Sequence, residues 1–492
     1  MAVINTNIAS LNAQRNLSSS SMSLSTSLQR LSSGLRINSA KDDAAGLAIS
    51  ERFTAQIRGM DQARRNANDG VSLSQTAEGA LSKMGDILQR VRELAVQSAN
   101  ATNSASDRLA INAEVGQLTS ELDRFSQSTE FNGLKLLDGS QASSVFQVGA
   151  NANQTITATT ANFRTTAYGS NQVGTTTATS SGVYATQGGP VSGAAVTASG
   201  NVLIQGGAAS GQISVAVTDS AKDIADKIKQ QTQTGVRASA RTETTLSFGA
   251  TGSYTLNTFG NNATGQTVTF NVTNTGTSAG LADAVTQFNN QSSKTGITAA
   301  LNSTGTGVVL TSDAGDNITL AVASGGNAGA VSGGGAALAT GASGALTVAG
   351  QVLLDSDKAY TVSTSGAALG ASVFGAAMAA GTQTTSALKS VSTLDVSNVA
   401  NATQALRIVD SALAVVNGQR ANFGALQSRF ESAISNLQIS SENMSAARSR
   451  IQDADFASET ANLSRNQILQ QAGTAMLSQA NKLPQQVLQL LQ

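Results

Sequence analysis

Long helical heptad patterns occupy both ends of this 492-residue chain, and the centre between them has none. From Leu406 to Ile451, apolar residues recur in alternating steps of three and four, a period that keeps one stripe of a helix facing a partner helix. The N-terminal end repeats the pattern twice between Leu17 and Ala95. These stripes predict a rod seam with the following members: Leu81, Met84, Leu88, Val91, Leu406, Val409, Leu413, Val416, Phe423, Phe430, Ile434 and Leu437. We therefore expect the two ends of the chain to pair with each other and to recruit other chains.

Composition excludes most catalytic chemistry. The chain contains no histidine and no cysteine, so it cannot build a Ser-His-Asp triad, a thiolate nucleophile or a zinc site with nitrogen or sulfur ligands. Asp42 and Asp43 could be paired carboxylates of an acid-base site, but a turn in which an aspartate caps the next helix explains them better. The glycine-rich tract 325–344 lacks the Gly-Lys-Ser/Thr of a phosphate loop. We expect a protein that is not an enzyme, with no catalytic, metal or cofactor-binding residues.

Charge and hydropathy restrict the partners. Thirty basic residues balance thirty acidic ones, and aromatic residues make up 3% of the chain, so a basic face with stacking aromatics for nucleic acid is not expected. The N-terminal residues have no pattern of a secretory signal peptide, and no apolar run of about eighteen residues occurs. We expect neither a nucleic-acid partner nor membrane insertion, and a dedicated export route if the protein leaves the cell.

The turn signals divide the terminal regions into helices. Gly34 and the polar residues up to Asp43 predict a break, as do residues 452–455. Ser106 or Asp107 is expected to cap a helix after a polar stretch. The expected helices span about residues 5–33, 43–98, 107–128, 397–450 and from 456 to the end of the chain. The dipeptides Asn132-Gly133 and Asp138-Gly139 predict hairpin turns, followed by strands around residues 145–156.

The centre of the chain carries an internal repeat. A strand-helix-strand-strand order occurs at about 202–250, with a strand expected at Gly235-Val236 after the helix, and again at about 266–322. This order favours folded α+β modules over a random coil. The tract 325–344 shows no apolar period and is expected to be a flexible surface segment.

Four polar residues interrupt the C-terminal stripe, at Arg420, Gln427, Ser441 and Arg448. Two interpretations remain open. The residues control register or form bonds between subunits, or the stripe is partly solvated at these positions.

Several long motifs at both ends resemble bacterial flagellin. The matching stretches are Ile4-Asn5-Thr6-Asn7, Leu28-Gln29-Arg30-Leu31-Ser32-Ser33-Gly34, Ile37-Asn38-Ser39-Ala40-Lys41-Asp42-Asp43-Ala44-Ala45-Gly46, Arg65-Asn66-Ala67-Asn68-Asp69-Gly70, Leu88-Gln89-Arg90-Val91-Arg92-Glu93-Leu94, Ala447-Arg448-Ser449-Arg450-Ile451 and Gln470-Gln471-Ala472-Gly473. The resemblance covers roughly the first 175 and the last 95 residues. The central insert departs from any pattern that the resemblance carries.

The resemblance implies a multidomain fold: a long α-helical coiled coil or bundle formed by both termini, a rod that contains a β-hairpin, and central α+β or β-rich outer domains. The expected division is an inner terminal-helix core of 1–43 with 455–492, a rod of 44–175 with 396–454, and variable surface-exposed outer domains in 176–395. It also implies a structural subunit that self-assembles into the extracellular filament of the bacterial flagellum for swimming motility. Such subunits are exported unfolded by the flagellar type III system, which would account for the missing signal peptide.

The terminal segments carry few charges, so their apolar residues are expected to pack against neighbouring subunits in the filament core. The candidates are Ile4, Ile8, Leu11, Leu24, Leu28, Leu31, Leu469, Met476, Leu483, Val487 and Leu490. A terminal helix with such a stripe cannot bury it alone, so we expect ordering of both termini to be coupled to polymerisation.

Recognition sites are implied by the resemblance alone. Gln89, Arg90, Leu94 and Glu114 are similar to the surface that a host Toll-like receptor recognises, and the apolar tail around Val487 is similar to one sensed by cytosolic receptors. Besides other flagellin subunits, the implied partners are the export chaperone, the filament cap and the hook–filament junction proteins. The alternatives are a junction protein with similar ends, a coiled-coil adhesin or surface-layer protein, and a carboxylate-dependent hydrolase in the insert.

Overall fold

The computed structural model of the chain describes residues 6–174, 183–187, 199–207, 209–262, 264–302, 304–323, 331–333, 336–337, 344–375 and 380–490. The chain divides into two compact units, each assembled from separate parts of the sequence. Unit 1 consists of Met1–Glu78, Gln141–Thr160 and Ala421–Gln492, and unit 2 consists of Gly79–Ser140 and Ala161–Arg420. Within the described residues, no helix is both long and apolar enough to cross a membrane. Most of the tract 325–344 lies outside the described residues.

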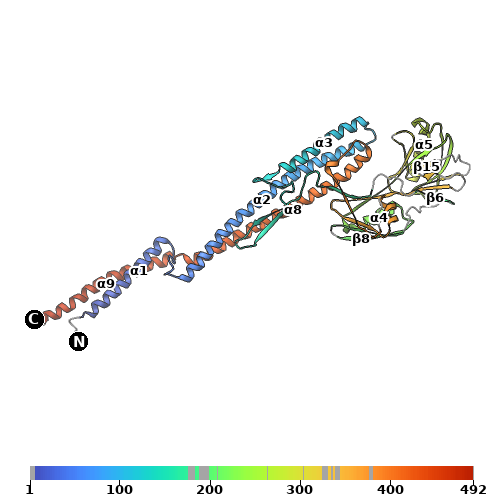
Figure 1. Ribbon diagram of the computed structural model, residues 1–492. Coiled ribbons are helices and arrows are strands. Elements are labelled where there is room, and N and C mark those ends of the chain that lie inside the picture. Colours follow the sequence, from blue (N-terminus) through green and yellow to red (C-terminus); the bar gives the residue numbers. More distant parts are fainter. Residues whose placement is uncertain are drawn as a thin grey trace. The chain divides into compact units, whose positions relative to one another are not determined.

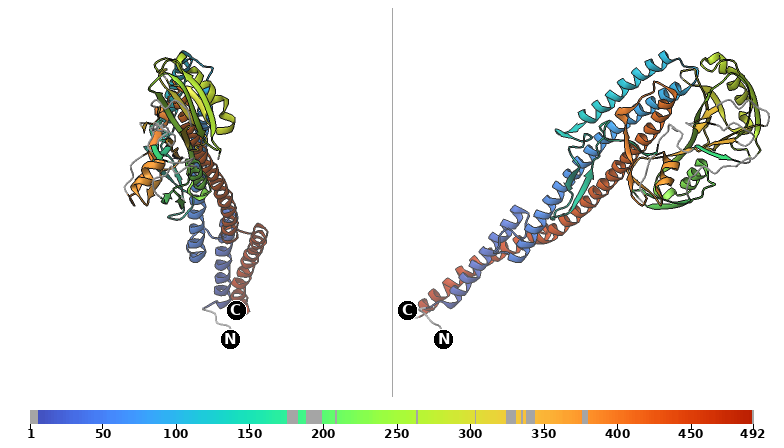
Figure 2. Two further views of the ribbon diagram at one scale, coloured as in Figure 1. Left: turned by 90° about the vertical axis from the view of Figure 1, so that its right-hand side faces the viewer. Right: turned by 45° about the vertical axis from the view of Figure 1, so that its right-hand side comes forward.

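Helices dominate both ends of the chain, as the heptad pattern predicted (Figure 1). The helices are α1 (Ile8–Ser33), α2 (Ala44–Ala99), α3 (Ala105–Ser128), α4 (Ala221–Lys229), α5 (Ser278–Asn290), α6 (Ser292–Thr295), α7 (Ala367–Phe374), α8 (Val399–Gln452) and α9 (Phe456–Leu490). The 3-10 turns are η1 (Thr232–Thr234) and η2 (Val391–Thr393). In unit 1, α1 lies alongside α9, and all views show this pairing (Figures 1 and 2).

Local side-chain chemistry sets the helix boundaries. Gly34 ends α1 in the left-handed conformation, with φ 71°, which costs glycine no steric penalty. Asp43 accepts a hydrogen bond from the Gly46 N–H at 2.8 Å and so caps α2. The cap of α3 is Ser104, which forms a capping box with Asp107. The prediction of Ser106 or Asp107 as that cap was therefore wrong by two or three residues.

A β-hairpin packs onto the helices of unit 1. It consists of β3 (Ser143–Gln147) and β4 (Thr155–Thr159), at the position that the sequence predicted. The Phe146 ring meets the Phe430 ring of α8 edge-on, with 5.4 Å between centroids. The Asn66 side chain of α2 donates a hydrogen bond to the Gln147 carbonyl at 3.0 Å. The hairpin therefore touches both long helices.

Only one of the two predicted hairpin turns joins strands. Asn132 and Gly133, both with positive φ, connect β1 (Glu130–Phe131) and β2 (Leu134–Lys135). At Asp138-Gly139 the chain bends, and the Asp138 carboxylate accepts the Ser140 N–H instead of closing a hairpin. An Asp-Gly pair without a flanking strand on each side forms a local turn only.

Every strand pairing among the described residues is antiparallel. The central strands are β5 (Gly169–Val173), β6 (Val183–Gln187), β7 (Gly200–Gln205), β8 (Ser210–Val215), β9 (Arg237–Phe248), β10 (Gly252–Phe259), β11 (Gln266–Val272), β12 (Thr298–Leu301), β13 (Val308–Ser312), β14 (Ile318–Val322), β15 (Val331–Gly333), β16 (Ala336–Ala337), β17 (Gly344–Val348), β18 (Gln351–Ser356), β19 (Thr361–Thr364), β20 (Thr384–Thr385) and β21 (Ala387–Ser390). Their sheet orders are β20-β19-β7-β8, β11-β10-β14-β17-β6 and β12-β13-β9-β18-β5-β21, and β15 also pairs with β9.

The internal repeat consists of a β-hairpin, a helix, a Thr-Gly turn and a strand. The first copy runs β7, β8, α4, η1 and β9, and the second runs β10, β11, α5, α6 and β12. Each turn places its glycine in the left-handed region, with φ 67° at Gly235 and 70° at Gly296. The strand predicted at Gly235-Val236 is therefore the end of this turn, and a single long strand, β9, follows it. The sequence pattern also left β10 out of the second copy.

Each copy of the repeat has its own hydrophobic core. In the first, Ile224 and Ile228 of α4 are buried with Val202 and Val215 of the hairpin. In the second, Leu281 and Phe288 of α5 are buried with aromatic and branched residues of β10 and β11. Separate cores are the mark of modules that fold around their own helix.

Candidate filament-assembly surfaces

Helix α1 exposes the apolar residues that were predicted to pack in a filament core. Ile8 is 60% exposed, Leu11 50% and Leu28 49%, whereas Leu24 and Leu31 are half-buried. Ser27 is buried within this 26-residue helix. Small side chains such as Ala13 and Ser20 are also half-buried. The contact with α9 therefore leaves much of the apolar surface of α1 uncovered.

Helix α9 shows the same arrangement. Leu469 is 49% exposed and Met476 64% exposed, and both belong to the predicted apolar stripe. The face toward α1 instead carries Gly473, where an added Cβ would lie 3.2 Å from the Leu17 side chain, and the buried Ala480. On α9, the small residues Gly473 and Ala480 lie in the pair, and the large apolar residues Leu469 and Met476 lie outside it. They leave an exposed face of the kind that marks a protein interaction site.

Some predicted core residues lie outside the described part of the structure. Ile4 precedes its first described residue, and the backbone at Leu483, Val487 and Leu490 is helical but their side chains are not described. Their role in packing stays a prediction.

The predicted rod seam is partly buried within the chain. In α2, Leu81, Met84, Leu88 and Val91 are fully buried. The buried seam residues of α8 are Val409, Val416, Phe423 and Phe430. The half-buried ones are Leu406, Leu413, Ile434 and Leu437.

Alanines of α8 are among the buried residues that the sequence pattern missed. Ala402, Ala405 and Ala412 are at most 1% exposed, as closely packed as the large residues of the seam. Their spacing of three and seven residues is a helical period, so the alanines carried a signal. It was missed because the stripe was traced through larger side chains.

Two of the four polar stripe residues bond across to α2 within unit 1. The Gln427 amide donates to the Glu78 carboxylate at 3.0 Å, and the Arg448 guanidinium donates to the Thr54 hydroxyl at 3.3 Å. These contacts join α8 to α2 from inside one chain. Ser441 is half-buried, as is Arg420.

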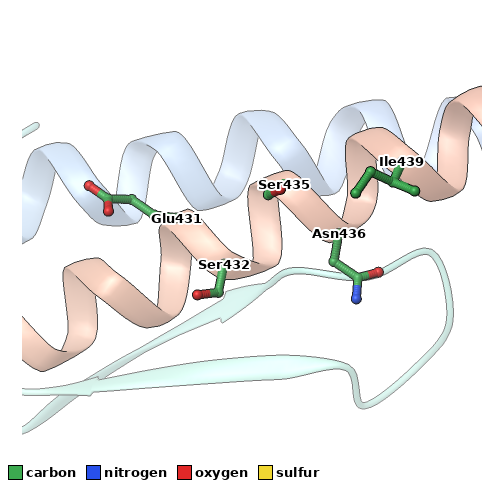
Figure 3. A pocket seen from close by; sticks show the side chains of 5 residues that line it. All are labelled: Glu431, Ser432, Ser435, Asn436 and Ile439. Atoms are coloured by element: carbon green, nitrogen blue, oxygen red, sulfur yellow. The ribbon is translucent and has the colours of Figure 1, made fainter.

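A shallow groove runs along α8 beside the β3–β4 hairpin (Figure 3). Its volume is about 570 Å³. The lining residues are Glu431, Ser432, Ser435, Asn436 and Ile439. Ile439 is 58% exposed, and no residue of α8 from 431 to 452 is fully buried within the chain. This flank of α8 has room for a further element against it.

A charged cluster joins α2 and α3 in unit 2. Arg90 reaches Glu114 at 3.0 Å and Glu93 at 3.1 Å, and its hydrogen bonds to Glu114 and Glu93 raise the pKa of its guanidinium. Gln89, Arg90 and Glu114 are exposed. Leu94, which was grouped with them from the resemblance, is 2% exposed. The exposed members of the group are therefore the other three, and the recognition role of all four residues stays a prediction.

The paired aspartates lie in the turn between α1 and α2. Asp42 accepts the backbone N–H groups of Ser39 at 2.9 Å and Asn38 at 3.2 Å, and these bonds, with one from the Ser39 hydroxyl, lower the pKa of its carboxyl. Asp43 caps α2. Among the described residues, no cluster of three or more acidic side chains is arranged to hold a metal ion. Both carboxylates thus have structural partners.

Comparison with known proteins gives one family for the whole chain. Residues 4–142 match the bacterial flagellin N-terminal helical region, 406–491 the bacterial flagellin C-terminal helical region, and 201–252 the flagellin hook IN motif. The chain is 49% identical over 508 residues to a B-type flagellin of Pseudomonas aeruginosa, with 99% of each chain covered. It is 39% identical over 506 residues to a flagellin of Salmonella typhimurium, again with 99% of each covered.

Proposed function

The chain belongs to the bacterial flagellin family and is a structural subunit of the extracellular flagellar filament, not an enzyme, and from that premise we propose how it enters the filament. The exposed apolar faces of α1 and α9 in one subunit pack against other surfaces of α1 and α9 in neighbouring subunits. Such a contact joins different surfaces of successive subunits and does not close on itself, so it propagates as a helical polymer.

The exposure of the terminal helices carries this proposal. Ile8, Leu28 and Met476 are each about half or more exposed in a single chain. Burying one large apolar side chain stabilises a complex by about 1.5–3 kcal/mol, so a few such residues on each helix are enough to drive association. The low charge of the two helices keeps the cost of burying charge small.

We propose that both termini become stably ordered only on assembly. A helix pair that buries so little apolar surface gains little to offset the conformational entropy of ordering its backbone, about 1–2 kcal/mol per residue. Neighbouring subunits supply the missing contacts.

The proposed domain division follows the two helix breaks. Residues 1–43 with 455–492 form the inner core, 44–175 with 396–454 the rod, and 176–395 the outer domains. Gly34 and the β-bridge residue Asp453 support the first boundary, because the helices of both ends stop there.

Further partners belong to the same proposal. The subunit is exported unfolded by the flagellar type III system, and an export chaperone, the filament cap and the hook–filament junction proteins bind its ends. Gln89, Arg90, Leu94 and Glu114 form the site for a host Toll-like receptor. The exposed position of Gln89, Arg90 and Glu114 on α2 and α3 supports that assignment.

Seeded growth tests the assembly proposal. We expect Met476→Glu to abolish elongation from filament seeds, because the variant would bury a charge in the core, while the monomer folds normally since Met476 is exposed. The control is Val217→Glu, which changes an apolar residue that is 41% exposed in unit 2 and should elongate normally. Electron microscopy of seeded samples gives the readout. Normal growth of Met476→Glu would remove α9 from the assembly surface.

A further inference from the structure

The break between α1 and α2 and the break between α8 and α9 are bonded to each other. Leu35 and Asp453 form an antiparallel β-bridge. On either side of it, the Arg36 N–H donates to the Gln452 carbonyl at 2.7 Å, and the Ala454 N–H donates to the Gly34 carbonyl at 3.0 Å. We call residues 34–37 and 451–454 the junction. It joins segments that are more than 400 residues apart in the sequence, and all of it lies within unit 1.

Arg36 adds a side-chain bond to this backbone pairing. Its Nη2 donates to the Ile451 carbonyl at 2.6 Å. Ile451 lies in the last turn of α8, where backbone carbonyls have no partner within the helix. A cation at this end also interacts favourably with the helix dipole. One side chain from the first break therefore caps the helix that leads into the second.

The rest of the first break is built to hold Arg36 in place. Ile37 is 1% exposed, and a Cβ added at Gly46 would lie 2.6 Å from its Cδ1, so the Ile37 side chain packs against the first turn of α2. Asp42 accepts the N–H groups of Asn38 and Ser39. The loop has one defined path, which sets the direction of Arg36.

We propose that Arg36 is a positioning residue for filament assembly, which ties the two helix breaks into one junction from which α1 and α9 become ordered together. The proposal rests on the assembly function above. Without the junction, the two terminal helices would have to find each other and their neighbours independently. With it, their first turns already start from adjacent points, which raises the effective concentration of one helix near the other and lowers the entropy lost on assembly.

Removal of the side chain tests this role. In Arg36→Ala we expect the critical concentration for seeded growth to rise about fivefold, the factor expected for loss of one hydrogen bond made by an exposed side chain. Arg36→Lys keeps the charge and a donor group. Its critical concentration should lie between those of Arg36→Ala and the wild type. The control is Arg450→Ala, which removes an exposed arginine from the same last turn of α8. Its critical concentration should stay within about twofold of the wild-type value, which is on the order of the effect of a surface charge. Equal growth of Arg36→Ala and wild type would overturn the proposal.

A disulfide across the bridge separates positioning from direct contact with a neighbouring subunit. The chain has no cysteine, so Leu35→Cys with Asp453→Cys introduces a single defined pair at bridge positions, where Cα atoms are close enough for a disulfide. The cross-link should form in the monomer, and the oxidised form of Leu35→Cys/Asp453→Cys/Arg36→Ala should recover the growth that Arg36→Ala loses. Failure to form the cross-link, or growth that stays impaired after it forms, would contradict the proposal. Failure of the wild-type chain to elongate would instead contradict the assembly function itself.

Discussion

Close packing at Gly70 shows how one residue couples three elements of unit 1. A Cβ at Gly70 of α2 would lie 2.5 Å from Cζ of Phe430. Phe430 is fully buried and also meets Phe146 of the hairpin. Helix α2, helix α8 and the hairpin therefore meet around a single ring that requires a glycine beside it.

We expect Gly70→Ala to destabilise unit 1 by about 1–3 kcal/mol, the usual cost of overpacking, even though alanine favours a helix. Chemical denaturation followed by far-UV circular dichroism measures the change. Gly79→Ala is the matched control in the same helix, because nothing lies within 4 Å of its added Cβ, and there alanine should stabilise by up to about 1 kcal/mol. If Gly70→Ala stabilised the protein as Gly79→Ala does, the Phe430 ring would be free to move away from position 70.

Asp355 is the buried carboxylate of unit 2. It is 5% exposed and accepts a hydrogen bond from Arg237 Nε at 2.9 Å. Arg237 also donates to the Ser411 hydroxyl of α8 at 2.7 Å. Burial raises the pKa of the Asp355 carboxyl, and Arg237 offsets only part of that effect. Burial likewise lowers the pKa of the neighbouring Arg407 guanidinium.

A raised pKa in the folded state means that folding favours protonated Asp355. The stabilisation from protonation is complete below the ordinary aspartate pKa of about 4 and is lost as the pH rises through the raised value. We therefore expect Asp355→Asn to be at least as stable as the wild type at neutral pH. The two free energies of unfolding should become equal below about pH 4.

Urea unfolding at several pH values measures this difference. Tyrosine fluorescence reports on unit 2, because all four tyrosines lie between residues 168 and 360. Asp313→Asn is the control, since Asp313 forms an exposed pair with Arg241, and its effect should be within about 1 kcal/mol at any pH. A large loss of stability in Asp355→Asn at neutral pH would show that the ion pair stabilises the fold and that the pKa is depressed instead.

At the scale of elements, the two copies of the repeat use the same backbone contact. A Cβ at Gly206, after β7, would lie 2.1 Å from the Thr234 carbonyl oxygen, and a Cβ at Gly260, after β10, would lie 2.1 Å from the Thr295 carbonyl oxygen. In each copy the hydroxyl of the turn threonine also accepts a hydrogen bond from the backbone N–H two residues later. The donor is Val236 in the first copy, at 3.3 Å, and Ile297 in the second, at 3.2 Å. The hairpin of each copy thus passes directly over its own Thr-Gly turn.

We expect Gly206→Ala and Gly260→Ala each to destabilise unit 2 by about 1–3 kcal/mol, because backbone atoms would have to separate. Thermal unfolding measures both. Gly276→Ala, in an exposed turn where the added Cβ is 3.7 Å from its nearest neighbour, should change stability by less than about 0.5 kcal/mol. A loss in one copy only would mean that the two contacts are not equivalent.

At the scale of the whole molecule, the two ends of the chain are brought together in unit 1 while the centre forms modules of its own in unit 2. This organisation lets the ends specialise in assembly. Helices α1 and α9 contain 26 and 35 residues, and most of the large apolar side chains that the structure describes in them are exposed.

We expect helical content, measured by far-UV circular dichroism, to rise when monomers assemble, because α1 and α9 gain their missing contacts in the polymer. Hydrogen exchange of the same segments should slow in parallel, whereas α4 and α5, which have cores of their own, should exchange alike in both states. Monomers with fully protected terminal helices would contradict the coupling of order to assembly.

The terminal helices, their breaks and the hairpin could be predicted because each depends on local rules. Each of these signals, namely the heptad spacing, Gly34 and Asn132-Gly133, depends only on residues that are close in the sequence. The strand at Gly235 was predicted wrongly, because a valine after a glycine looks like a strand unless the left-handed turn is known. The receptor role of Leu94 rests on resemblance alone, and the structure buries its side chain, which no local pattern distinguishes from an exposed leucine of the same period.

The sequence by itself determined the family, the helices at both ends and the absence of histidine and cysteine chemistry, since these follow from residue identity and period. The tertiary structure decided which face of each helix is covered. Period places Leu469 and Met476 on one stripe, but only packing shows that Leu17 of α1 lies against Gly473 and that these two large side chains stay exposed. It also decided that Arg36 reaches Ile451, because a contact between the two ends depends on the path of the chain and not on any local pattern.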